Sequence, residues 1–328
     1  MTSALDLDRV TLSARIERWP LREPFRIARG ARTEAVVVVV EARSSPHLGR
    51  GEAVPYARYG ETPESVLAAL AGARPSELDR LAGAARAALE AALLDLETQV
   101  TGVPVHERLD LRPPAPFAIA TTLSIDTPDS MARRATEVPG ALLKLKLAGD
   151  GLDVARLRAV ADARPDARLW LDANEGLDER GYQGLVEALE ALPVVLLEQP
   201  LPEGRDAALA RSVRPRRAVS ICADESAHDA ASFAALVDRY DAVNVKLQKA
   251  GGLVPALRAI ERARALNLDV VLGCMVSTSL AIAPAALLAP LVDFVDLDGA
   301  LFLAKDRDGG GRFERGLFVP PTLWGTPR

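Results

Sequence analysis

Three short apolar runs between residues 168 and 224 each end in a carboxylate and follow one another at equal spacing. They close at Asp172, Glu198 and Asp224, and 26 residues separate each acid from the next. A fourth apolar run ends in Lys246, 22 residues after Asp224. Short apolar runs bounded by polar residues are typical of buried parallel strands. The equal spacing therefore predicts a repeated strand–helix unit whose acids converge on one face of a sheet.

Beyond a proline-rich segment at residues 111–116, the chain alternates strand-like and helix-like patterns. Eight strand-like runs separated by amphipathic helices predict a parallel barrel closed on itself. An open doubly wound sheet is the alternative, but it needs a glycine-rich phosphate turn after the first strand, which residues 124–128 do not provide. The expected strands are 117–125, 141–147, 168–171, 194–197, 218–223, 242–247, 269–272 and 292–297, and the clearest helices are 152–163, 181–192, 230–239 and 254–266.

The first part of the chain has a different pattern and is expected to form an α+β unit. Strands are predicted over residues 10–21 and 35–42, and helical periodicity begins at residue 63. Two loops, 23–32 and 49–60, carry arginine and aromatic side chains. We therefore expect an α+β domain over 1–115, the barrel over 116–302, and a tail over 303–328 that returns to the first domain.

Composition excludes several classes of function. The 328 residues are 49% hydrophobic and 26% charged, with a net charge of -5, so no nucleic-acid or anionic membrane partner is expected. No apolar run reaches the ~20 residues that a membrane-spanning helix needs, and the N-terminus lacks the pattern of a signal peptide. Cys222 and Cys274 lie in apolar runs and are expected to be free thiols. These features predict a cytoplasmic protein.

The acids at the strand ends predict a metal site. In a parallel barrel the active site lies at the carboxyl ends of the strands. Asp172, Glu198 and Asp224 include no histidine or thiolate, and such a set suits a hard cation that prefers oxygen, namely one Mg²⁺ per subunit. The alternative is that these acids only form ion pairs with neighbouring lysines, because buried charges need partners.

The lysines predict the type of reaction. Lys144 and Lys146 lie two residues apart and share a strand face, while Lys246 comes from the sixth strand, across the barrel. A lysine acts as a base once a neighbouring cation lowers its pKa. Two opposed lysines allow a proton to leave one face of an α-carbon and return to the other, which is racemisation or epimerisation. A single active lysine would serve elimination.

Five motifs resemble those of the enolase superfamily, muconate-lactonising-enzyme subgroup. The resemblance covers nearly the whole chain and implies an α+β capping domain on a (β/α)7β TIM-like barrel. It implies Mg²⁺ ligands at Asp172, Glu198 and Asp224. It also implies an acid/base pair at Lys146 and Lys246, assisted at the substrate carboxylate by Lys144. The motifs are Lys144-Leu145-Lys146, Leu171-Asp172-Ala173-Asn174, Glu198-Gln199-Pro200, Ala223-Asp224-Glu225-Ser226 and Asn244-Val245-Lys246.

Histidine placement disfavours the mandelate-racemase subgroup, which carries a histidine base on the seventh strand. The only histidines are His47, His106 and His228, and none falls on the expected strands six to eight.

Asp296 and Asp298, at the end of the eighth strand, indicate the class of substrate. Two acids there suit a substrate with a free ammonium group, and Thr122 on the first strand is expected to contact it as well. This pair resembles the dipeptide epimerases, in particular those acting on L-Ala-D/L-Glu in murein-peptide metabolism. Ion pairing of the two acids with neighbouring loops is the alternative. N-acylamino-acid racemase, o-succinylbenzoate synthase and muconate cycloisomerase use similar lysines, but their substrates have no ammonium group.

Arginines of the two capping loops are the candidates for binding a glutamate side chain. Arg26, Arg29, Arg32 and Arg58 each offer a bidentate fork, and we expect one of them to contact the substrate. Many relatives carry Glu at the position of Ser277, and some carry Arg at that of Gly30, so the preferred dipeptide stays open. Oligomeric state also stays open, although barrels of this family are often homo-oligomers.

Overall fold

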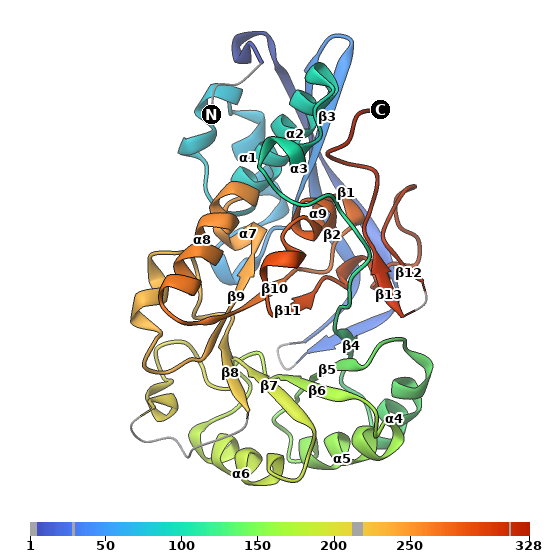
Figure 1. Ribbon diagram of the computed structural model, residues 1–328, viewed down its shortest axis with the longest axis vertical. Helices are drawn as coiled ribbons and strands as arrows, with labels where there is room; N and C mark the ends of the chain where they lie inside the picture. Colours follow the sequence, from blue (N-terminus) through green and yellow to red (C-terminus); the bar gives the residue numbers. More distant parts are fainter. Residues whose placement is uncertain (1–4, 28–29, 212–218, 315) are drawn as a thin grey trace.

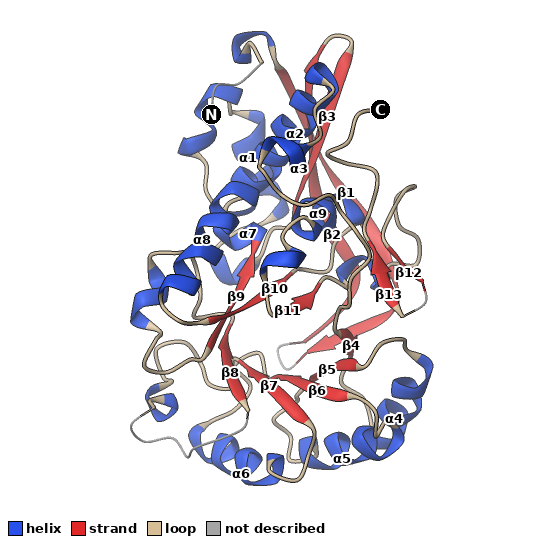
Figure 2. Ribbon diagram, in the orientation of Figure 1, coloured by secondary structure: helices blue, strands red, loops and turns tan. Residues whose placement is uncertain are grey.

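The computed structural model describes residues 5–27, 30–211, 219–314 and 316–328. Its main parts are a three-stranded antiparallel sheet, with helices packed on it, and an eight-stranded sheet that curls into a barrel (Figure 1). Figure 2 shows α-helices around the outside of the barrel strands. The predicted fold class, an α/β barrel with an α+β capping domain, is confirmed.

All neighbouring strands of the barrel are parallel and follow the chain order. The backbone N–H of Ala120 donates to the carbonyl of Val295 at 2.8 Å, which connects the first strand to the last. The eight strands are β4 (Thr121–Leu123), β5 (Leu142–Lys146), β6 (Arg168–Asp172), β7 (Val194–Glu198), β8 (Ser220–Ala223), β9 (Ala242–Lys246), β10 (Asp269–Gly273) and β11 (Phe294–Asp296).

Helices fill most of the connections between these strands. Side chains cap the N-termini of α4 and α6, where Thr127 and Asp178 accept hydrogen bonds from the backbone of the first turn. The helices are α4 (Pro128–Glu137), α5 (Asp153–Ala163), α6 (Glu179–Leu189), α7 (Leu247–Ala250), α8 (Leu253–Ala265) and α9 (Ser279–Ala286), with short 3₁₀ turns η4 (Ala207–Leu209), η5 (Ser232–Ala235), η6 (Ala289–Leu291) and η7 (Gly299–Phe302).

The helix predicted over 230–239 is wrong, because this segment contains only the 3₁₀ turn η5. The hydroxyl of Ser232 accepts from the backbone N–H groups of His228 and Asp229 and donates to the carbonyl of Asp229. The Asp229 carboxylate accepts from the N–H of Ser232 in turn. Such local side-chain bonds compete with helical hydrogen bonding.

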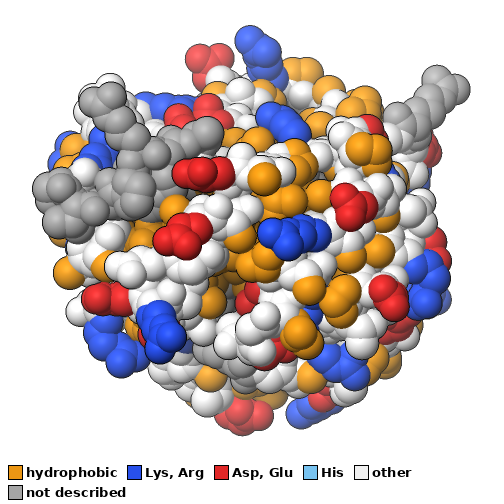
Figure 3. Space-filling model, turned by 90° about the horizontal axis from the view of Figure 1, so that it is seen from below, with side chains coloured by type: hydrophobic (Ala, Val, Ile, Leu, Met, Phe, Trp, Pro, Cys, Tyr) orange, Lys and Arg blue, Asp and Glu red, His pale blue; other side chains and the backbone are white. Residues whose placement is uncertain are grey.

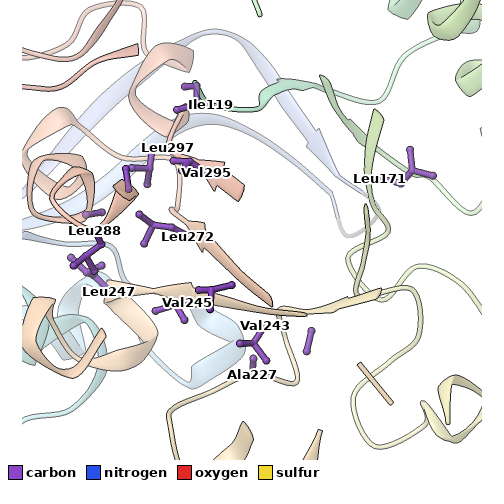
Figure 4. Packing of buried hydrophobic residues seen from close by; sticks show 14 of the residues in the cluster. Ile119, Leu171, Ala227, Val243, Val245, Leu247, Leu272, Leu288, Val295 and Leu297 are labelled. Atoms are coloured by element: carbon purple, nitrogen blue, oxygen red, sulfur yellow. The ribbon is translucent and has the colours of Figure 1, made fainter. Parts of the chain in front are cut away.

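The main hydrophobic core lies between the barrel strands and the surrounding helices. Figure 4 shows Val245, Leu272 and Leu288 among its side chains, which are almost completely buried. A smaller apolar layer, built around Trp170 and Leu196, fills the inside of the barrel. Alternation along each strand therefore sends one set of residues to the helices and the other to the barrel axis.

The capping part begins with the antiparallel strands β1 (Thr11–Ile27), β2 (Gly30–Ser44) and β3 (His47–Ala53). Both β1 and β2 extend further than predicted, because residues 25–27 pair with 30–32 to continue the hairpin through the segment expected to be a loop. Residues 47–53, of which 49–53 were expected in a loop, pair with β2. The other elements are η1 (Leu7–Arg9), η2 (Ala57–Tyr59), α1 (Pro63–Ala71), η3 (Pro75–Arg80), α2 (Gly83–Thr101), α3 (Val105–Arg108) and the C-terminal hairpin β12 (Arg312–Glu314) and β13 (Leu317–Val319).

Buried polar contacts join the capping sheet to the barrel and to the C-terminal segment. The carboxylate of Glu52 on β3 accepts from the backbone N–H of Thr278 at 2.9 Å and from Arg307 at 3.0 Å. Near the end of the chain, the indole of Trp324 donates to the carbonyl of Ala91 on α2 at 3.0 Å. Segments far apart in sequence are therefore fixed against one another.

The surface carries charges of both signs. On the face drawn in Figure 3, acidic and basic side chains are interspersed with apolar ones. In the described residues, no helix combines the length and the apolar character that crossing a membrane requires.

Close packing of α2 on β3 depends on glycine. A Cβ added to Gly51 would lie 2.0 Å from the backbone carbonyl oxygen of Ala88, which cannot move without displacing the helix. We expect Gly51→Ala to lower the free energy of unfolding by about 1–3 kcal/mol or more. Urea denaturation measures the change.

Gly184 provides the matched control, because it lies exposed within α6 and an added Cβ meets no atom within 4 Å. Gly184→Ala should raise the free energy of unfolding by about 0.5–1 kcal/mol, since alanine favours the helix. Equal effects of the two substitutions would contradict the packing argument.

Candidate active site

The carboxyl ends of the barrel strands open into a cavity of about 550 Å³ that residues of β1 and β2 also line. Strand register brings the predicted residues together: Lys146, Asp172 and Glu198 are successive lateral partners on β5, β6 and β7. Gly273 of β10 lies beside both Lys246 and Asp296. The charged and polar residues lining the cavity are Arg32, Arg58, Thr122, Lys144, Lys146, Asn174, Asp224, Lys246, Asp296 and Asp298.

Lys144 lies at the centre of this charged cluster and is 1% exposed. Its Nζ is 2.7 Å from a carboxylate oxygen of Glu198, 2.7 Å from one of Asp296 and 3.0 Å from one of Asp172. Burial alone would lower the pKa of Lys144, but the charges of Asp172, Asp296 and Glu198 outweigh it and raise the pKa well above its usual value. Lys144 is therefore a permanent ammonium shared by three acids.

The other two predicted lysines each contact one acid. Lys146 Nζ donates to Asp172 Oδ2 at 2.6 Å, and Lys246 Nζ donates to Asp224 Oδ2 at 2.7 Å. Burial opposes the charged form of Lys246, but Asp224 and Glu198 raise its pKa well above the usual value. This direction is opposite to the lowering that the sequence predicted, because two carboxylates face this ammonium.

The three acids titrate differently because their neighbours differ. Burial would raise the pKa of Asp172 and of Asp224, but ammonium groups beside each outweigh it and hold both values below the usual range. Burial and the charge of Asp172 raise the pKa of Glu198 to about 7. Mutual repulsion thus leaves Glu198 as the acid whose charge is least compensated.

The donor chemistry of these acids fits a hard divalent cation. All three are at most 4% exposed and offer only oxygen, and burial together with the charges of Asp172 and Asp224 raises the pKa of Glu198. Lysine ammonium groups contact all three carboxylates. In the described part of the chain, no three His, Cys, Asp or Glu side chains stand in a geometry that coordinates one ion. The acids nevertheless form one negative cluster in which a cation could replace the ammonium contacts.

Two neutral side chains that the sequence reasoning missed hold the carboxylate of Glu198. Trp170 Nε1 donates to Oε2 at 2.9 Å, and Asn244 Nδ2 donates to Oε1 at 2.7 Å. Trp170 lies two residues before Asp172 and Asn244 two before Lys246, so the two-residue period of a strand was the signal that places both on the inner face.

Gln199 fixes the backbone that carries Asp224. Its Oε1 accepts from the N–H of Asp224 at 2.9 Å and from that of Ser226 at 3.1 Å. Its Nε2 donates to the carbonyl of Leu201, to Ser226 and to the hydroxyl of Tyr240. The ends of β7 and β8, and hence Glu198 and Asp224, are therefore held in one relative position. Gln199 belongs to the motif Glu198-Gln199-Pro200, but no role was predicted for its side chain from the sequence.

A fourth lysine at the site was not predicted. Lys249 Nζ contacts Asp224 Oδ1 at 2.8 Å and the Asp224 carbonyl at 2.7 Å. It lies on the short helix α7, three residues after Lys246, which ends strand β9. Burial, followed by the charge of Lys246 among the lowering causes, lowers the pKa of Lys249.

Asp296 and Asp298 both line the cavity but have different partners. Asp296 pairs with Lys144, whereas Asp298 Oδ2 accepts from the backbone N–H of Thr122 at 2.7 Å. Burial and the charge of Asp296 raise the pKa of Asp298 to about 7. Thr122 therefore contributes its backbone to this end of the cavity.

The capping arginines lie in different places. Arg32 and Arg58 line the cavity; Arg26 is not among the lining residues, and Arg29 lies outside the described residues. Arg58 Nη2 contacts Glu175 at 2.7 Å and Glu203 at 2.9 Å. The guanidinium carbon of Arg32 lies 5.9 Å from the centre of the Tyr56 ring.

Of the two positions at which some relatives carry a different residue, Gly30 and Ser277, only Gly30 lines the cavity. Gly30 lines the cavity, with φ +137° and no atom within 4 Å of an added Cβ, whereas Ser277 is 1% exposed and lies outside the lining.

Two models of known protein families match this chain. The model "Mandelate racemase / muconate lactonizing enzyme, N-terminal domain" matches residues 9–109, and "Enolase C-terminal domain-like" matches residues 130–325. The chain belongs to the mandelate racemase/muconate lactonizing enzyme family of the enolase superfamily.

Individual relatives are epimerases and racemases. The chain is 42% identical over 313 residues to the L-Ala-D/L-Glu epimerase of Escherichia coli (strain K12), covering 92% of this chain and 96% of that protein. It is 40% identical over 304 residues to an N-acetyl-D-glutamate racemase of Pseudoalteromonas sp, covering 88% and 95%. These relatives share a reaction at an α-carbon and differ in what the amino group carries.

Solved structures with a similar fold include dipeptide epimerases. An enolase family member from Agrobacterium tumefaciens, with homology to dipeptide epimerases and with bound sodium and L-Ala-L-Glu, matches with a TM-score of 0.90 and 43% identity. The match covers 96% of this chain and all of that one. Other dipeptide epimerases with this fold were crystallised with Mg and a dipeptide.

The Gln199 contacts lead to a stability prediction. Gln199→Leu leaves the buried N–H groups of Asp224 and Ser226 without their acceptor, at about 1–3 kcal/mol each. We expect urea denaturation to give a free energy of unfolding lower by about 2 kcal/mol or more.

Gln99→Leu is the control for this substitution. Gln99 Nε2 donates to the carbonyl of Thr326 and its Oε1 accepts from Arg328 near the chain end. Because these groups can bond to water instead, the loss should stay below about 1 kcal/mol. A loss at Gln199 no larger than at Gln99 would contradict the assigned role.

Proposed function

We propose that this protein is a Mg²⁺-dependent dipeptide epimerase, most active on L-Ala-D/L-Glu. The observation that carries the proposal is the placement of Lys146 and Lys246 on β5 and β9, four strands apart in an eight-strand barrel, with both side chains lining one cavity. Two lysines on opposite sides of a substrate suit proton removal from one face and return to the other. The family and its epimerase relatives support the same reaction.

The proposed chemistry is a 1,1-proton transfer. One lysine, in its neutral form, takes the α-proton, and the other, as an ammonium, delivers a proton to the opposite face. The electron pair left by the departing proton is held as an enolate of the substrate carboxylate, near the ammonium of Lys144. Either lysine serves as base, depending on which epimer binds, so the final proton count of the protein is unchanged.

Asp172, Glu198 and Asp224 are the proposed ligands of one Mg²⁺. When bound, the ion would supply positive charge to the substrate carboxylate as negative charge develops there. The protein's own contribution is the rigid placement of the acids by Trp170 and Gln199.

Asp296, Asp298 and Thr122 form the proposed site for the amino end of the dipeptide. A substrate ammonium at this end would meet one carboxylate compensated by Lys144, that of Asp296, and a second, that of Asp298, which accepts from the backbone N–H of Thr122. The opposite end of the cavity, under the capping loops, would hold the second side chain.

Among the capping arginines, Arg32 and Arg58 are the better supported candidates for contacting a glutamate side chain, because both line the cavity. Arg58 would have to share its charge with Glu175 and Glu203. Arg26 and Arg29 remain candidates from the sequence alone.

Racemisation of an N-acylated amino acid is a second candidate function. The ion pair between Lys144 and Asp296 favours it, because that pair leaves only Asp298 to compensate an ammonium. With its pKa raised to about 7 by burial and Asp296, Asp298 can carry a proton and donate to an acyl carbonyl. The racemase relative acts on such a substrate.

Three broader expectations accompany the proposal. We propose that residues 1–115 and 303–328 form the capping domain and residues 116–302 the catalytic barrel. The protein is expected to act in the cytoplasm, where murein peptides would be its substrates. A homo-oligomer fits the family, and no nucleic-acid or membrane partner is expected.

Hydrogen exchange at the α-carbon tests the assignment. In deuterated water with Mg²⁺, the wild-type protein should incorporate deuterium into L-Ala-L-Glu and L-Ala-D-Glu, read by mass spectrometry. Lys146→Ala and Lys246→Ala should each lower epimerisation by about 10²–10⁴-fold and confine any exchange to one epimer. Exchange into both epimers by either variant would overturn the two-base assignment.

The exposed Lys305 provides a control, because Lys305→Ala leaves every lysine of the cavity in place. N-acetylglutamate, included in the same assay, separates the two candidate functions. Faster exchange with it than with any dipeptide would favour the racemase.

The acids predict how Mg²⁺ affinity changes with pH. Burial and Asp172 raise the pKa of Glu198 to about 7, above its ordinary value, so the metal-free fold gains stability from this group at low pH and loses it as pH rises through about 7. A cation needs the ionised carboxylate. Affinity measured by isothermal titration calorimetry should therefore fall about tenfold per unit below that pH.

Asp298 has a similarly raised pKa, but it is not a proposed ligand. The Asp298→Asn variant should keep the pH dependence of Mg²⁺ binding. An affinity that stays constant on both sides of neutrality would contradict the assignment of Glu198.

A further inference from the structure

Trp170 occupies the interior of the barrel directly under the charged cluster. It is 0% exposed and is the largest fully buried side chain among the described residues. It lies on β6, two residues before Asp172, so both side chains point toward the barrel axis. The other fully buried residues of that layer are small or aliphatic: Ala120, Leu196, Cys222, Ala242 and Val271. A large ring therefore fills a space that small neighbours leave open.

The indole makes two polar contacts with the cluster. Its Nε1 donates to Glu198 Oε2 at 2.9 Å, and the Lys144 ammonium lies 4.5 Å from the centre of its ring. Lys144 Nζ also reaches the same oxygen of Glu198 at 2.7 Å. One side chain thus contacts both the anion and the cation of a buried ion pair.

The position of the indole is itself fixed. Phe294 of β11 packs edge-on against it, with ring centres 6.1 Å apart. Asn244 on β9 donates to the other oxygen of Glu198 at 2.7 Å. The carboxylate of Glu198 is therefore held through both oxygens by neutral N–H donors, one on β6 and one on β9.

Neutral donors have a particular advantage beside a cation site. An ammonium such as that of Lys144 repels an incoming divalent cation, whereas an indole N–H orients the carboxylate and carries no net charge. When a cation shares the charge of Glu198, the contact from Trp170 can persist while the ammonium contact weakens.

We propose that Trp170 is a positioning residue that orients Glu198 for Mg²⁺ and seats Lys144 over its ring. This inference rests on the proposed role of Glu198 as a metal ligand. It assigns to a residue inside the barrel a function beyond filling space.

Two matched tryptophan substitutions separate positioning from packing. Trp324 is also buried and also donates one indole hydrogen bond, at 3.0 Å to Ala91, far from the cluster. Trp170→Phe and Trp324→Phe therefore each remove one buried N–H donor and some volume. Mg²⁺ affinity of the full-length protein is measured by isothermal titration calorimetry, and stability by thermal unfolding.

Both variants should unfold at lower temperature than the wild type. Only Trp170→Phe should bind Mg²⁺ more weakly, by about tenfold or more, as expected for the loss of an outer partner of a metal ligand. Trp324→Phe should stay within about twofold. Wild-type affinity in Trp170→Phe, or an equal loss in Trp324→Phe, would overturn the inference.

A second measurement leaves Trp170 intact, in case Trp170→Phe does not fold. The chain has three tryptophans, so Trp19→Phe/Trp324→Phe leaves Trp170 as the single emitter. Its fluorescence should change saturably with Mg²⁺, because the cation alters the charges in contact with the ring. Emission that does not respond, in a protein that calorimetry shows to bind Mg²⁺, would overturn the inference.

The Glu198→Gln variant tests the proposed metal site independently of Trp170. If this variant binds Mg²⁺ as the wild type does, the metal site itself is wrong and the role of Trp170 fails with it. If Glu198→Gln loses binding and Trp170→Phe does not, only the inference about Trp170 fails.

Discussion

The ammonium of Lys144, buried against three carboxylates, is the contact on which the barrel interior depends. Charges of this kind cannot be removed from water unless they compensate one another. The acids come from β6, β7 and β11, so the strands must stay in register for the compensation to hold. Trp170 below and Gln199 at the rim then restrict how far the acids can move. The buried charges are therefore balanced only when the barrel strands keep this register.

Parallel register explains why so much of the site could be predicted from the sequence. A 26-residue period equals one strand–helix repeat, and residues that close successive repeats become lateral neighbours, as Asp172 and Glu198 do. The two-residue period of a strand likewise set Lys144 and Lys146 on the same face. The eight predicted strand positions agree with those observed to within a few residues, apart from the first, which forms only at Thr121–Leu123. Local periodicity was sufficient to predict these positions because the barrel repeats the same strand–helix unit.

What could not be predicted depends on contacts between distant segments. Residues 23–32 contain the loop signals Pro24 and Gly30, yet 25–27 pair with 30–32 because each strand supplies the other's hydrogen-bond partners. The ion pairs of Arg58 need Glu175 and Glu203, more than a hundred residues away. The importance of Lys249 depends on the carboxylate of Asp224 lying 2.8 Å away. No pattern within a short window contains these distances.

The charge arrangement also explains why a cation site and a base belong together. Lys246 can accept a proton only after losing its own, and Asp224 opposes that loss by holding the ammonium at 2.7 Å. If Asp224 shares its charge with a divalent cation, the attraction that keeps the proton on Lys246 weakens, and repulsion between the two cations favours the neutral amine. Lys249 contacts both the carboxylate and the carbonyl of Asp224, so these contacts can hold Asp224 in place while Lys246 is neutral.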